Sequence, residues 1–267
     1  MLKELWLFKK PEEINIYRWN GENNKNFGDI LWPYLVEKIS GKTPNRVNKY
    51  CLKEYFLTIG SIFSNANKNA IVWGSGIIWK KEKIKKPKHI CAVRWPKTRE
   101  RLLSLWYDCP EIYGDPGLLI SKFYTPKTTK KYELWIIPHY VDYQKICKKW
   151  LPENVKVINL LDPIEKVIDD IYSCKRTISS SLHGIIVSHT YNIPSMWVEF
   201  SKKLAGDGVK FEDYFLSVGI KPYWWYDYSE IPNIEEIIDF LDTHHRDSIQ
   251  IDLDRLLEAC PFKKEKK

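Results

Sequence analysis

The sequence lacks several features that would define whole classes of protein. No run approaches the ~20 consecutive apolar residues of a membrane-spanning helix, and the apolar part of the N-terminus is too short for a secretory signal. Six cysteines are present, but none forms a C-x-x-C pair or lies at zinc-ligand spacing from a histidine. The phosphate-loop pattern G-x-x-x-x-G-K-[ST] and repeats of solenoid length are also missing. We therefore expect a cytoplasmic protein with reduced thiols and no metal centre.

The apolar content and net charge of the sequence indicate a folded protein with an anionic ligand. Apolar residues make up 44% of the 267 residues, which is enough for a substantial core. The formal charge of +8 suits a phosphorylated or acidic substrate. Trp (12) and Tyr (16) are frequent, although the cluster YWWYDY at 223–228 is more consistent with packing than with a sugar site. No basic-aromatic motif stands out, so we expect no nucleic-acid partner.

One stretch of the chain, residues 80–88, concentrates positive charge in six lysines. Such a run usually forms a solvated surface. The alternative is a weak, salt-sensitive contact with an anionic membrane, because the stretch lacks the apolar face needed for insertion. A peripheral position on the inner face of the cell membrane is therefore a second expectation for localisation.

Strand-like and helix-like segments alternate along most of the chain. The alternation stops in a stretch rich in Pro, Thr and Lys at 123–131 and then begins again. This pattern predicts an α/β fold of two Rossmann-like parallel-sheet domains, which we place at 1–125 and 126–267. The final helices, predicted at 234–241 and 251–260, belong to the second domain, with the option of packing back on the first.

Residues 177–200, TISSSLHGIIVSHTYNIPSMWVEF, hold the most informative pattern. Serine hydroxyls precede a helix with an apolar face, Asn-Ile-Pro ends the helix, and an apolar strand follows. His183 therefore falls in the first helical turn, where free N–H groups and the helix dipole bind anions. That end of a helix disfavours an imidazolium until an anion arrives, which makes His183 a candidate proton donor. A histidine that only hydrogen-bonds the turn is the equally weighted alternative.

Other candidate residues follow predicted strands, at the edge of an open α/β sheet that lines its ligand crevice. Gly28 permits a close approach at a strand–helix junction, and Asp29 either caps that helix or serves the site. Arg94 ends another strand, where its guanidinium could bind a phosphate or carboxylate through two hydrogen bonds. Further candidates are Asn26, Gly74, Ser75, Asp115 and His139 near strand ends, and Lys210 near a helix start.

Seven motifs, taken together and in order, resemble the polysaccharide pyruvyltransferase family. They are NFGD (26–29), IVWGSG (71–76), VRWPKTRERL (93–102), YGDPGLL (113–119), IIPHYVD (136–142), SSSLHGIIVSH (179–189) and KFEDYFLSVG (210–219). The resemblance implies two Rossmann-like halves facing a cleft, a GT-B-like arrangement. It also implies transfer of the enolpyruvyl group of phosphoenolpyruvate onto a sugar, which forms a pyruvate ketal and releases phosphate.

The implied reaction assigns partners and roles to these residues. The donor substrate is phosphoenolpyruvate, no cofactor is needed, and the acceptor is a sugar of a polysaccharide or of its lipid-linked precursor. His183 suits the acid that protonates the donor's methylene carbon, while His139 and Asp29 are candidates for deprotonating the acceptor. The expected donor contacts come from Arg94, Lys210, Asn26, Gly28, Gly74, Ser75, Asp115, Ser180 and Ser181.

One departure from the family concerns the donor site. Many members carry Arg-x-His where this chain has Ser181-Leu182-His183. In this chain, the anion that this arginine would bind must be bound instead by Ser180, Ser181, the helix N-terminus or Arg94.

Two other functions compete with this interpretation. A nucleotide-sugar glycosyltransferase of similar shape would use the same glycine turns and helix starts for a diphosphate. A binding module for glycans or nucleic acid would use the charge and the aromatic residues, but no motif supports it. Release of phosphate from phosphoenolpyruvate, release of a nucleotide, or binding without turnover would separate the three.

Overall fold

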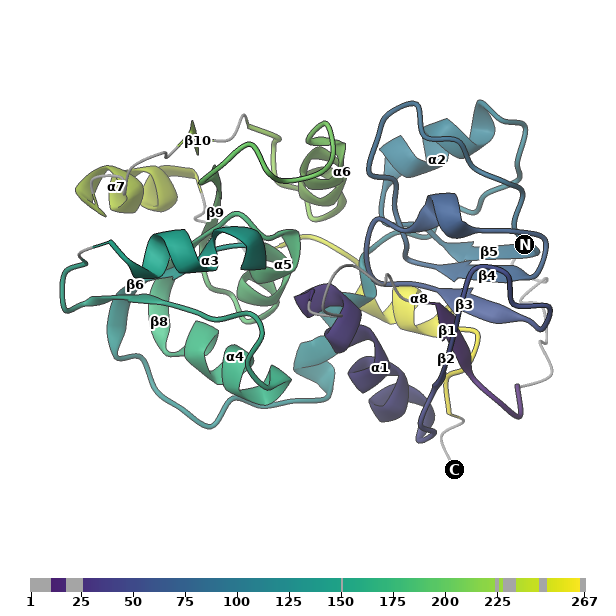
Figure 1. The fold of residues 1–267 in the computed structure, drawn as a ribbon, viewed down its shortest axis with the longest axis horizontal. Helices are drawn as coiled ribbons and strands as arrows, with labels where there is room; N and C mark the ends of the chain where they lie inside the picture. Colours follow the sequence, from purple (N-terminus) through teal and green to yellow (C-terminus); the bar gives the residue numbers. More distant parts are fainter. Residues whose placement is uncertain are drawn as a thin grey trace.

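A computed structural model describes residues 11–17, 26–149, 151–223, 226–227, 234–244 and 249–264. In these parts of the chain every strand belongs to one of two parallel sheets. Figure 1 shows the sheets at opposite ends of the molecule, with helices between them. This arrangement confirms the α/β class and the two parallel sheets, and it is consistent with Rossmann-like domains.

The first sheet has the strand order β2-β1-β3-β4-β5 and is covered by helices on both faces. Along β3 and β4, alternate side chains join different apolar clusters, one reaching helix α2 and the other reaching α1 and α8. Two-sided burial is typical of a parallel sheet whose strands are joined by helical crossovers. The elements are β1 (Asn15–Tyr17), α1 (Phe27–Ser40), β2 (Asn45–Val47), β3 (Tyr55–Leu57), the 3-10 helix η1 (Phe63–Asn65), β4 (Ala70–Trp73), β5 (His89–Ala92), α2 (Pro96–Leu103) and the 3-10 helix η2 (Pro116–Lys122).

The second sheet has the strand order β10-β9-β8-β6-β7. Its faces pack against α3 and α7 on one side and against α4 and α5 on the other. The elements are β6 (Tyr132–Ile137), α3 (Tyr140–Cys147), β7 (Val155–Val157), α4 (Ile164–Tyr172), β8 (Cys174–Ser179), α5 (Leu182–Thr190), β9 (Ser195–Glu199), α6 (Val209–Ser217), β10 (Tyr226–Asp227), α7 (Ile234–His244) and α8 (Leu253–Glu258).

Both sheets follow the same winding, in which the second strand lies outside the first and the third lies on its other side. The direction of winding therefore reverses between β1 and β3 in the first sheet and between β6 and β8 in the second. Open α/β sheets bind ligands beyond the carboxyl ends of the strands at such a reversal. The topology thus marks one candidate site on each sheet.

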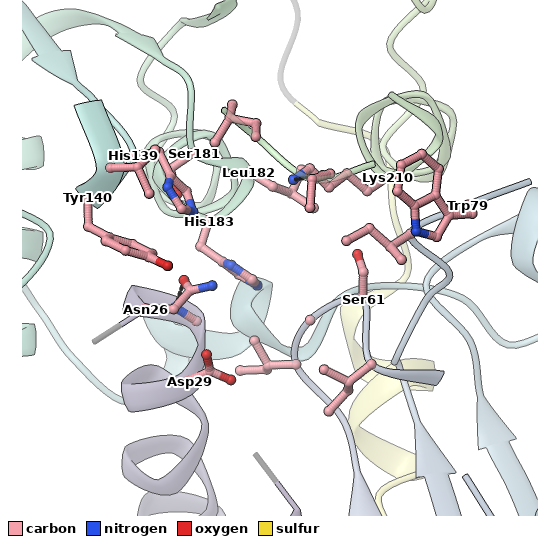
Figure 2. Close-up of a pocket in the computed structure, with 18 of the residues that line it drawn as sticks. Asn26, Asp29, Ser61, Trp79, His139, Tyr140, Ser181, Leu182, His183 and Lys210 are labelled. Carbon is pink, nitrogen blue, oxygen red and sulfur yellow. Dashed lines mark hydrogen bonds between the residues drawn. The ribbon is translucent and has the colours of Figure 1, made fainter. Parts of the chain in front are cut away.

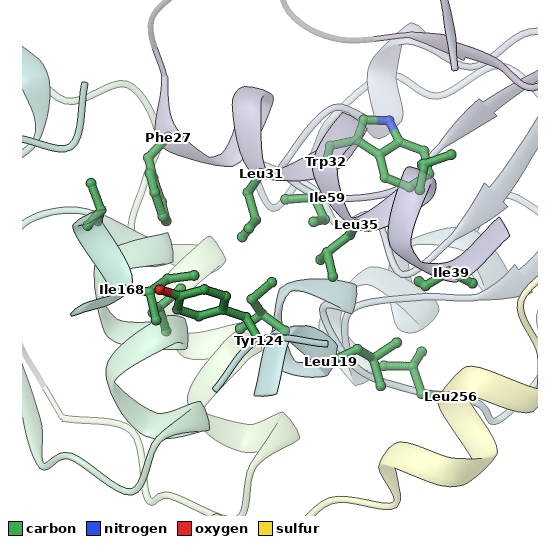
Figure 3. Close-up of a cluster of buried hydrophobic side chains, with 14 of the residues drawn as sticks. Phe27, Leu31, Trp32, Leu35, Ile39, Ile59, Leu119, Tyr124, Ile168 and Leu256 are labelled. Carbon is green, nitrogen blue, oxygen red and sulfur yellow. The ribbon is translucent and has the colours of Figure 1, made fainter. Parts of the chain in front are cut away.

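A continuous apolar core joins the two sheets through helices (Figure 3). Leu31 and Leu35 on α1 lie in the same cluster as Leu119 on η2 and Ile168 on α4. Tyr34 also donates a hydrogen bond to Glu165 Oε1 at 2.9 Å across the boundary. This shared packing fixes the two sheets relative to each other, and the division at residue 125 stays a prediction.

The C-terminal helix α8 returns to the first sheet. Trp73 Nε1 donates to Leu256 O at 2.9 Å, and a fully buried Leu256 side chain packs into the shared core. Phe262 then places its ring 5.7, 5.2 and 5.5 Å from those of Trp32, Phe56 and Trp73. These aromatic contacts fasten the C-terminal segment to the face of the first sheet that α1 also covers.

Several sequence expectations need correction. The stretch 112–120, expected to carry a strand end, forms only an isolated bridge at Tyr113 followed by η2, because Asp115 caps a 3-10 turn at Pro116. The short strand β2 was not expected, and its exposed side chains explain the weak pattern. The apolar run at 2–8, whose pattern predicts a short strand, lies outside the described residues. Tyr223 packs against Phe215 and Phe240, as expected for the YWWYDY cluster, whose remaining side chains are not described.

Candidate active site

A cavity of about 440 Å³ lies where the reversal points of the two sheets meet (Figure 2). Its volume falls within the range of about 300–1,000 Å³ that is common for small-ligand sites. Loops after β1 and β3 form one wall, and loops after β6 and β8 form the facing wall. The polar and aromatic lining includes Asn26, Asp29, Ser61, Trp79, Glu82, His139, Tyr140, Ser181, His183, Lys203 and Lys210.

His183 occupies the first turn of α5, as the sequence predicts. Ser181 is the N-cap residue, but its side chain makes no capping hydrogen bond, so it does not satisfy the N–H groups of the first turn. The imidazole lies against the backbone of α1 at Gly28, where a Cβ atom would come within 2.3 Å of His183 Cε1. Gly28 is therefore required for the approach of this histidine rather than for the approach of a ligand.

Asp115 lies behind His183 and outside the cavity lining. Its carboxylate is fully buried, and Oδ1 accepts a hydrogen bond from Gly117 N at 2.9 Å. The other oxygen, Oδ2, lies 3.7 Å from His183 Nε2, and neither of these two buried atoms has a hydrogen-bond partner among the described residues. The expected substrate contact of Asp115 is thus replaced by a contact with the imidazole. The imidazole of His183 is thus held between the Asp115 carboxylate, on the side of Nε2, and the backbone of α1 at Gly28.

Helix α1 brings Asn26 and Asp29 to the cavity. Asn26 caps the helix, because its side chain accepts a hydrogen bond from Gly28 N at 3.2 Å. Asp29 therefore does not cap the helix; it lies three residues after Asn26 and lines the cavity, with 8% of the residue exposed. Figure 2 shows both side chains facing the same space as His183. A carboxylate and an amide thus lie on the wall opposite the second sheet.

His139 follows β6 and lines the cavity beside α5. Its backbone N–H donates to Ser180 Oγ at 2.8 Å, so Ser180 supports the loop without reaching the cavity itself. Burial, together with the positive charges of Lys210 and His183, lowers the pKa of His139 to about 3. The imidazole is therefore neutral at physiological pH, and its buried Nδ1 has no hydrogen-bond partner among the described residues.

Lys210, at the start of α6, brings a cation into the cavity. Its Nζ donates to Ala205 O at 3.3 Å, and no carboxylate of the described residues lies within the 4.0 Å of an ion pair. Burial lowers its pKa to about 8, with a further contribution from Arg94 that Glu199 partly opposes. An ammonium held in this way gains from any anion that enters the cavity.

Arg94 lies beneath the cavity wall and does not reach the cavity. Its side chain is fully buried, with Nε 3.3 Å from Asp213 Oδ2 and NH2 donating to Ile77 O at 2.8 Å. NH1 donates to Ser61 Oγ at 2.7 Å, and Ser61 does line the cavity. Arg94 was expected to bind the donor directly. Its guanidinium is instead hydrogen-bonded to buried partners and supports the loop that carries Ser61.

Gly74 and Ser75 also lie behind the wall. Gly74 has a φ of +82°, and a Cβ atom there would meet Pro116 Cδ at 2.3 Å, so a glycine is required for packing. The buried Ser75 hydroxyl donates to Gly60 O at 3.0 Å and holds the loop after β3. Both residues shape the site without touching a ligand in it.

Several residues of the lining were not anticipated from the sequence, among them Ser61, Trp79, Tyr140 and Lys203. Ser61 follows β3, Trp79 follows the glycine turn after β4, Tyr140 follows His139, and Lys203 follows β9. Trp79 is 48% exposed and Tyr140 is 36% exposed, although large aromatic side chains are commonly buried. Their position after a strand was the available signal, since Tyr140 lies within the motif at 136–142 and Trp79 follows the motif at 71–76.

Comparison with known proteins identifies the family. Residues 41–201 match the polysaccharide pyruvyl transferase family. An uncharacterized protein of Acanthamoeba polyphaga mimivirus is 33% identical over 209 residues, which cover 73% of this chain and 72% of the viral protein. The chain belongs to the polysaccharide pyruvyl transferase family, a family of transferases, and this membership supports a pyruvyltransferase-type function with a polysaccharide acceptor. No solved structure matches the chain.

The sequence predicts that no helix spans a membrane, and the helices of the structure test this expectation. Within the described ranges, none has both the length and the apolar character required to cross a membrane.

Proposed function

We propose that the protein transfers the enolpyruvyl group of phosphoenolpyruvate to a sugar of a polysaccharide or of its lipid-linked precursor. The observation that carries this proposal is His183, which enters the cavity from a helix N-terminus with the buried carboxylate of Asp115 at its back. That arrangement supplies a proton donor next to an anion-binding helix end. Family membership supplies the reaction type.

Phosphoenolpyruvate, the donor, is held by positively charged groups on the elements that surround the second sheet. Lys210 and Lys203 both line the cavity, and the N–H groups of the first turn of α5 are left uncapped by Ser181. These groups replace the arginine that many members carry two residues before the histidine, whereas Arg94 acts only through Ser61. Phosphate and carboxylate of the donor are thus neutralised by ammonium groups and backbone N–H groups.

The chemistry follows from these positions. His183 delivers a proton to the methylene carbon of phosphoenolpyruvate, and the adjacent carbon becomes an oxocarbenium-like centre. One acceptor hydroxyl attacks that carbon, the C–O bond to phosphate breaks, and a second hydroxyl closes the ketal. One of the two hydroxyl protons returns to His183 and restores the proton that it gave to the methylene carbon. The other leaves with phosphate. Asp115, with Oδ2 3.7 Å from Nε2, holds the imidazole of His183 in place during these steps.

Asp29 is the better of the two proposed bases for the acceptor hydroxyl. It is a carboxylate on the wall opposite His183, whereas His139 accepts a proton poorly because its pKa lies near 3. His139 instead offers a neutral ring N–H to the donor or acceptor. Trp79 and Tyr140 present partly exposed aromatic faces at the cavity, and such faces stack on sugar rings.

The fold in this proposal is GT-B-like, with 1–125 and 126–267 as its two halves and α8 packed on the first half. The proposed setting is the cytoplasm, where phosphoenolpyruvate and sugar precursors occur together. No cofactor takes part in the proposed reaction, and phosphoenolpyruvate is consumed as a substrate.

The test uses the purified chain, phosphoenolpyruvate and a panel of sugar acceptors. The expected result is acceptor-dependent phosphate release and a product with the mass of a pyruvate ketal. Nucleotide-sugar donors, supplied in parallel, should release no nucleotide. Nucleotide release without consumption of phosphoenolpyruvate would instead establish a glycosyltransferase.

A further inference from the structure

The lysine-rich segment leaves the cavity wall at Trp79 and runs to the start of β5. Its side chains alternate in burial. Glu82 and Ile84 point inward, with 7% exposed surface each, while the lysines are exposed. The fold therefore buries Glu82 and Ile84 and leaves the positive charges of this segment in solvent. The outward lysines are Lys80, Lys81, Lys83, Lys85, Lys86 and Lys88.

Most of these charges form no ion pair with the described residues. Lys80 pairs with Glu212 at 3.4 Å, and Lys88 pairs with Glu54. Among the described residues, the remaining four lysines of the segment have no carboxylate within 4.0 Å. Four like charges within six residues repel one another, so this cluster gains from an external anionic partner.

An exposed apolar element lies at the end of α2. Leu103 is 43% exposed, and Trp106 is 94% exposed. Trp106 also has a φ of +60°, a left-handed conformation that is unfavourable for a bulky side chain. Trp106 therefore costs the folded chain backbone strain without contributing buried apolar area. A residue of this kind suggests a contact outside the chain.

The lysine segment and the end of α2 are fastened to each other. The Tyr107 hydroxyl donates a hydrogen bond to Ile84 O at 3.2 Å, and Arg101 Nε donates one to Glu82 O at 3.0 Å. Ile84, Leu105 and Tyr107 also belong to one apolar cluster. The lysine segment and the end of α2 thus lie side by side, and both carry exposed side chains. This lysine–tryptophan face comprises Lys81, Lys83, Lys85, Lys86, Leu103 and Trp106.

We propose that the lysine–tryptophan face docks the protein on an anionic lipid bilayer. Lysines are attracted to anionic headgroups, and a tryptophan prefers the headgroup level, where its ring is apolar and its N–H remains hydrated. Asp108 is also exposed beside Trp106, and its single charge leaves the face positive. Two apolar side chains are too few for the core of a stable protein–protein interface, and a leucine adds nothing to nucleic-acid stacking.

The face has a direct connection to the cavity. Trp79 lines the cavity, and the lysine segment begins at the next residue. A bilayer seated on the face would therefore lie near the cavity, in reach of a lipid-linked sugar. The docking itself does not depend on the proposed reaction, because it is measured without any substrate.

The experiment is cosedimentation of the full chain with vesicles of phosphatidylcholine, alone or with about a third phosphatidylglycerol. Binding is expected only to the anionic vesicles, and part of it should survive when NaCl rises from about 0.1 M to about 0.5 M. A quadruple Lys→Gln variant of the face should lower the partition coefficient at least about tenfold. Trp106→Gly, which relaxes the backbone, should remove the salt-resistant part. The quadruple variant changes Lys81, Lys83, Lys85 and Lys86.

A charge-matched variant controls for the loss of four positive charges. It replaces four exposed lysines within residues 126–267 and should bind as the unmodified protein does. Equal loss in both quadruple variants, or no binding to anionic vesicles, would overturn the proposal. Unchanged salt resistance in Trp106→Gly, or displacement of the protein from vesicles by equimolar RNA, would do so as well. The control lysines are Lys127, Lys131, Lys148 and Lys221.

Discussion

Replacing Gly28 with alanine tests the geometry of His183 directly. An alanine Cβ at this position would lie 2.3 Å from His183 Cε1 and 2.5 Å from Nδ1. Ordinary carbon contacts are about 3.5 Å or longer, so the imidazole must move by about 1.2 Å or more. A misplacement of about 1 Å at a reacting group costs about 10²-fold in rate. We expect Gly28→Ala to lose about that much turnover while phosphoenolpyruvate affinity changes little.

The stability of the same variant provides an internal check. Alanine normally stabilises a helix over glycine by about 0.5–1 kcal/mol, and Gly28 lies inside α1. In the parent chain this gain is offset by the clash with the imidazole. In a His183→Ala background the clash is absent, so the same substitution should raise the free energy of unfolding by about 0.5–1 kcal/mol.

The assays are steady-state phosphate release and urea unfolding of the two single variants and the double variant. A Gly28→Ala enzyme with unchanged turnover would show that His183 does not depend on this contact. Equal stability effects of Gly28→Ala in both backgrounds would contradict the clash, because the coupling between the two positions would then be zero.

Four further predictions concern the site and the fold. His183→Gln and His183→Ala should each lose about 10²–10⁴-fold in turnover with a smaller loss of donor affinity in titrations, and a Gln variant with near-normal turnover would rule out proton transfer. Asp115→Asn keeps an oxygen for Gly117 N but removes the charge facing His183. It should lose about 10²-fold in turnover with little change in donor affinity, and unchanged turnover would refute the pairing. The pKa of Lys210 is lowered to about 8, so its charged form dominates below that pH. Donor affinity should therefore fall as pH rises through about 8, and Lys210→Met should weaken binding and remove this dependence. Trp106→Gly should raise the free energy of unfolding in urea by about 0.5–1 kcal/mol, because it relieves a left-handed backbone at a solvent-exposed position, and a destabilised variant would mean that Trp106 packs against the fold.

The predicted fold rested on short-range patterns, and those parts agree with the structure. Alternating apolar strands and helices predicted two parallel sheets, and the serine-rich turn predicted a helix start before His183. These features depend on the preferences of a few adjacent residues, which the sequence displays directly. The placement of Asn26 and Asp29 beside the site follows from the same logic, because strand ends meet at one edge of a sheet.

The tertiary structure alone decided what surrounds each candidate. Arg94 ends a strand, as expected, but its partner Asp213 lies 119 residues further along and draws the guanidinium into the interior. Asp115 faces His183 because η2 packs against α5, and Trp106 joins the lysine segment because Tyr107 bonds to Ile84. A local pattern fixes which residues end a strand or begin a helix. The distance between two such residues depends on chain topology and close packing, which no short stretch of sequence contains.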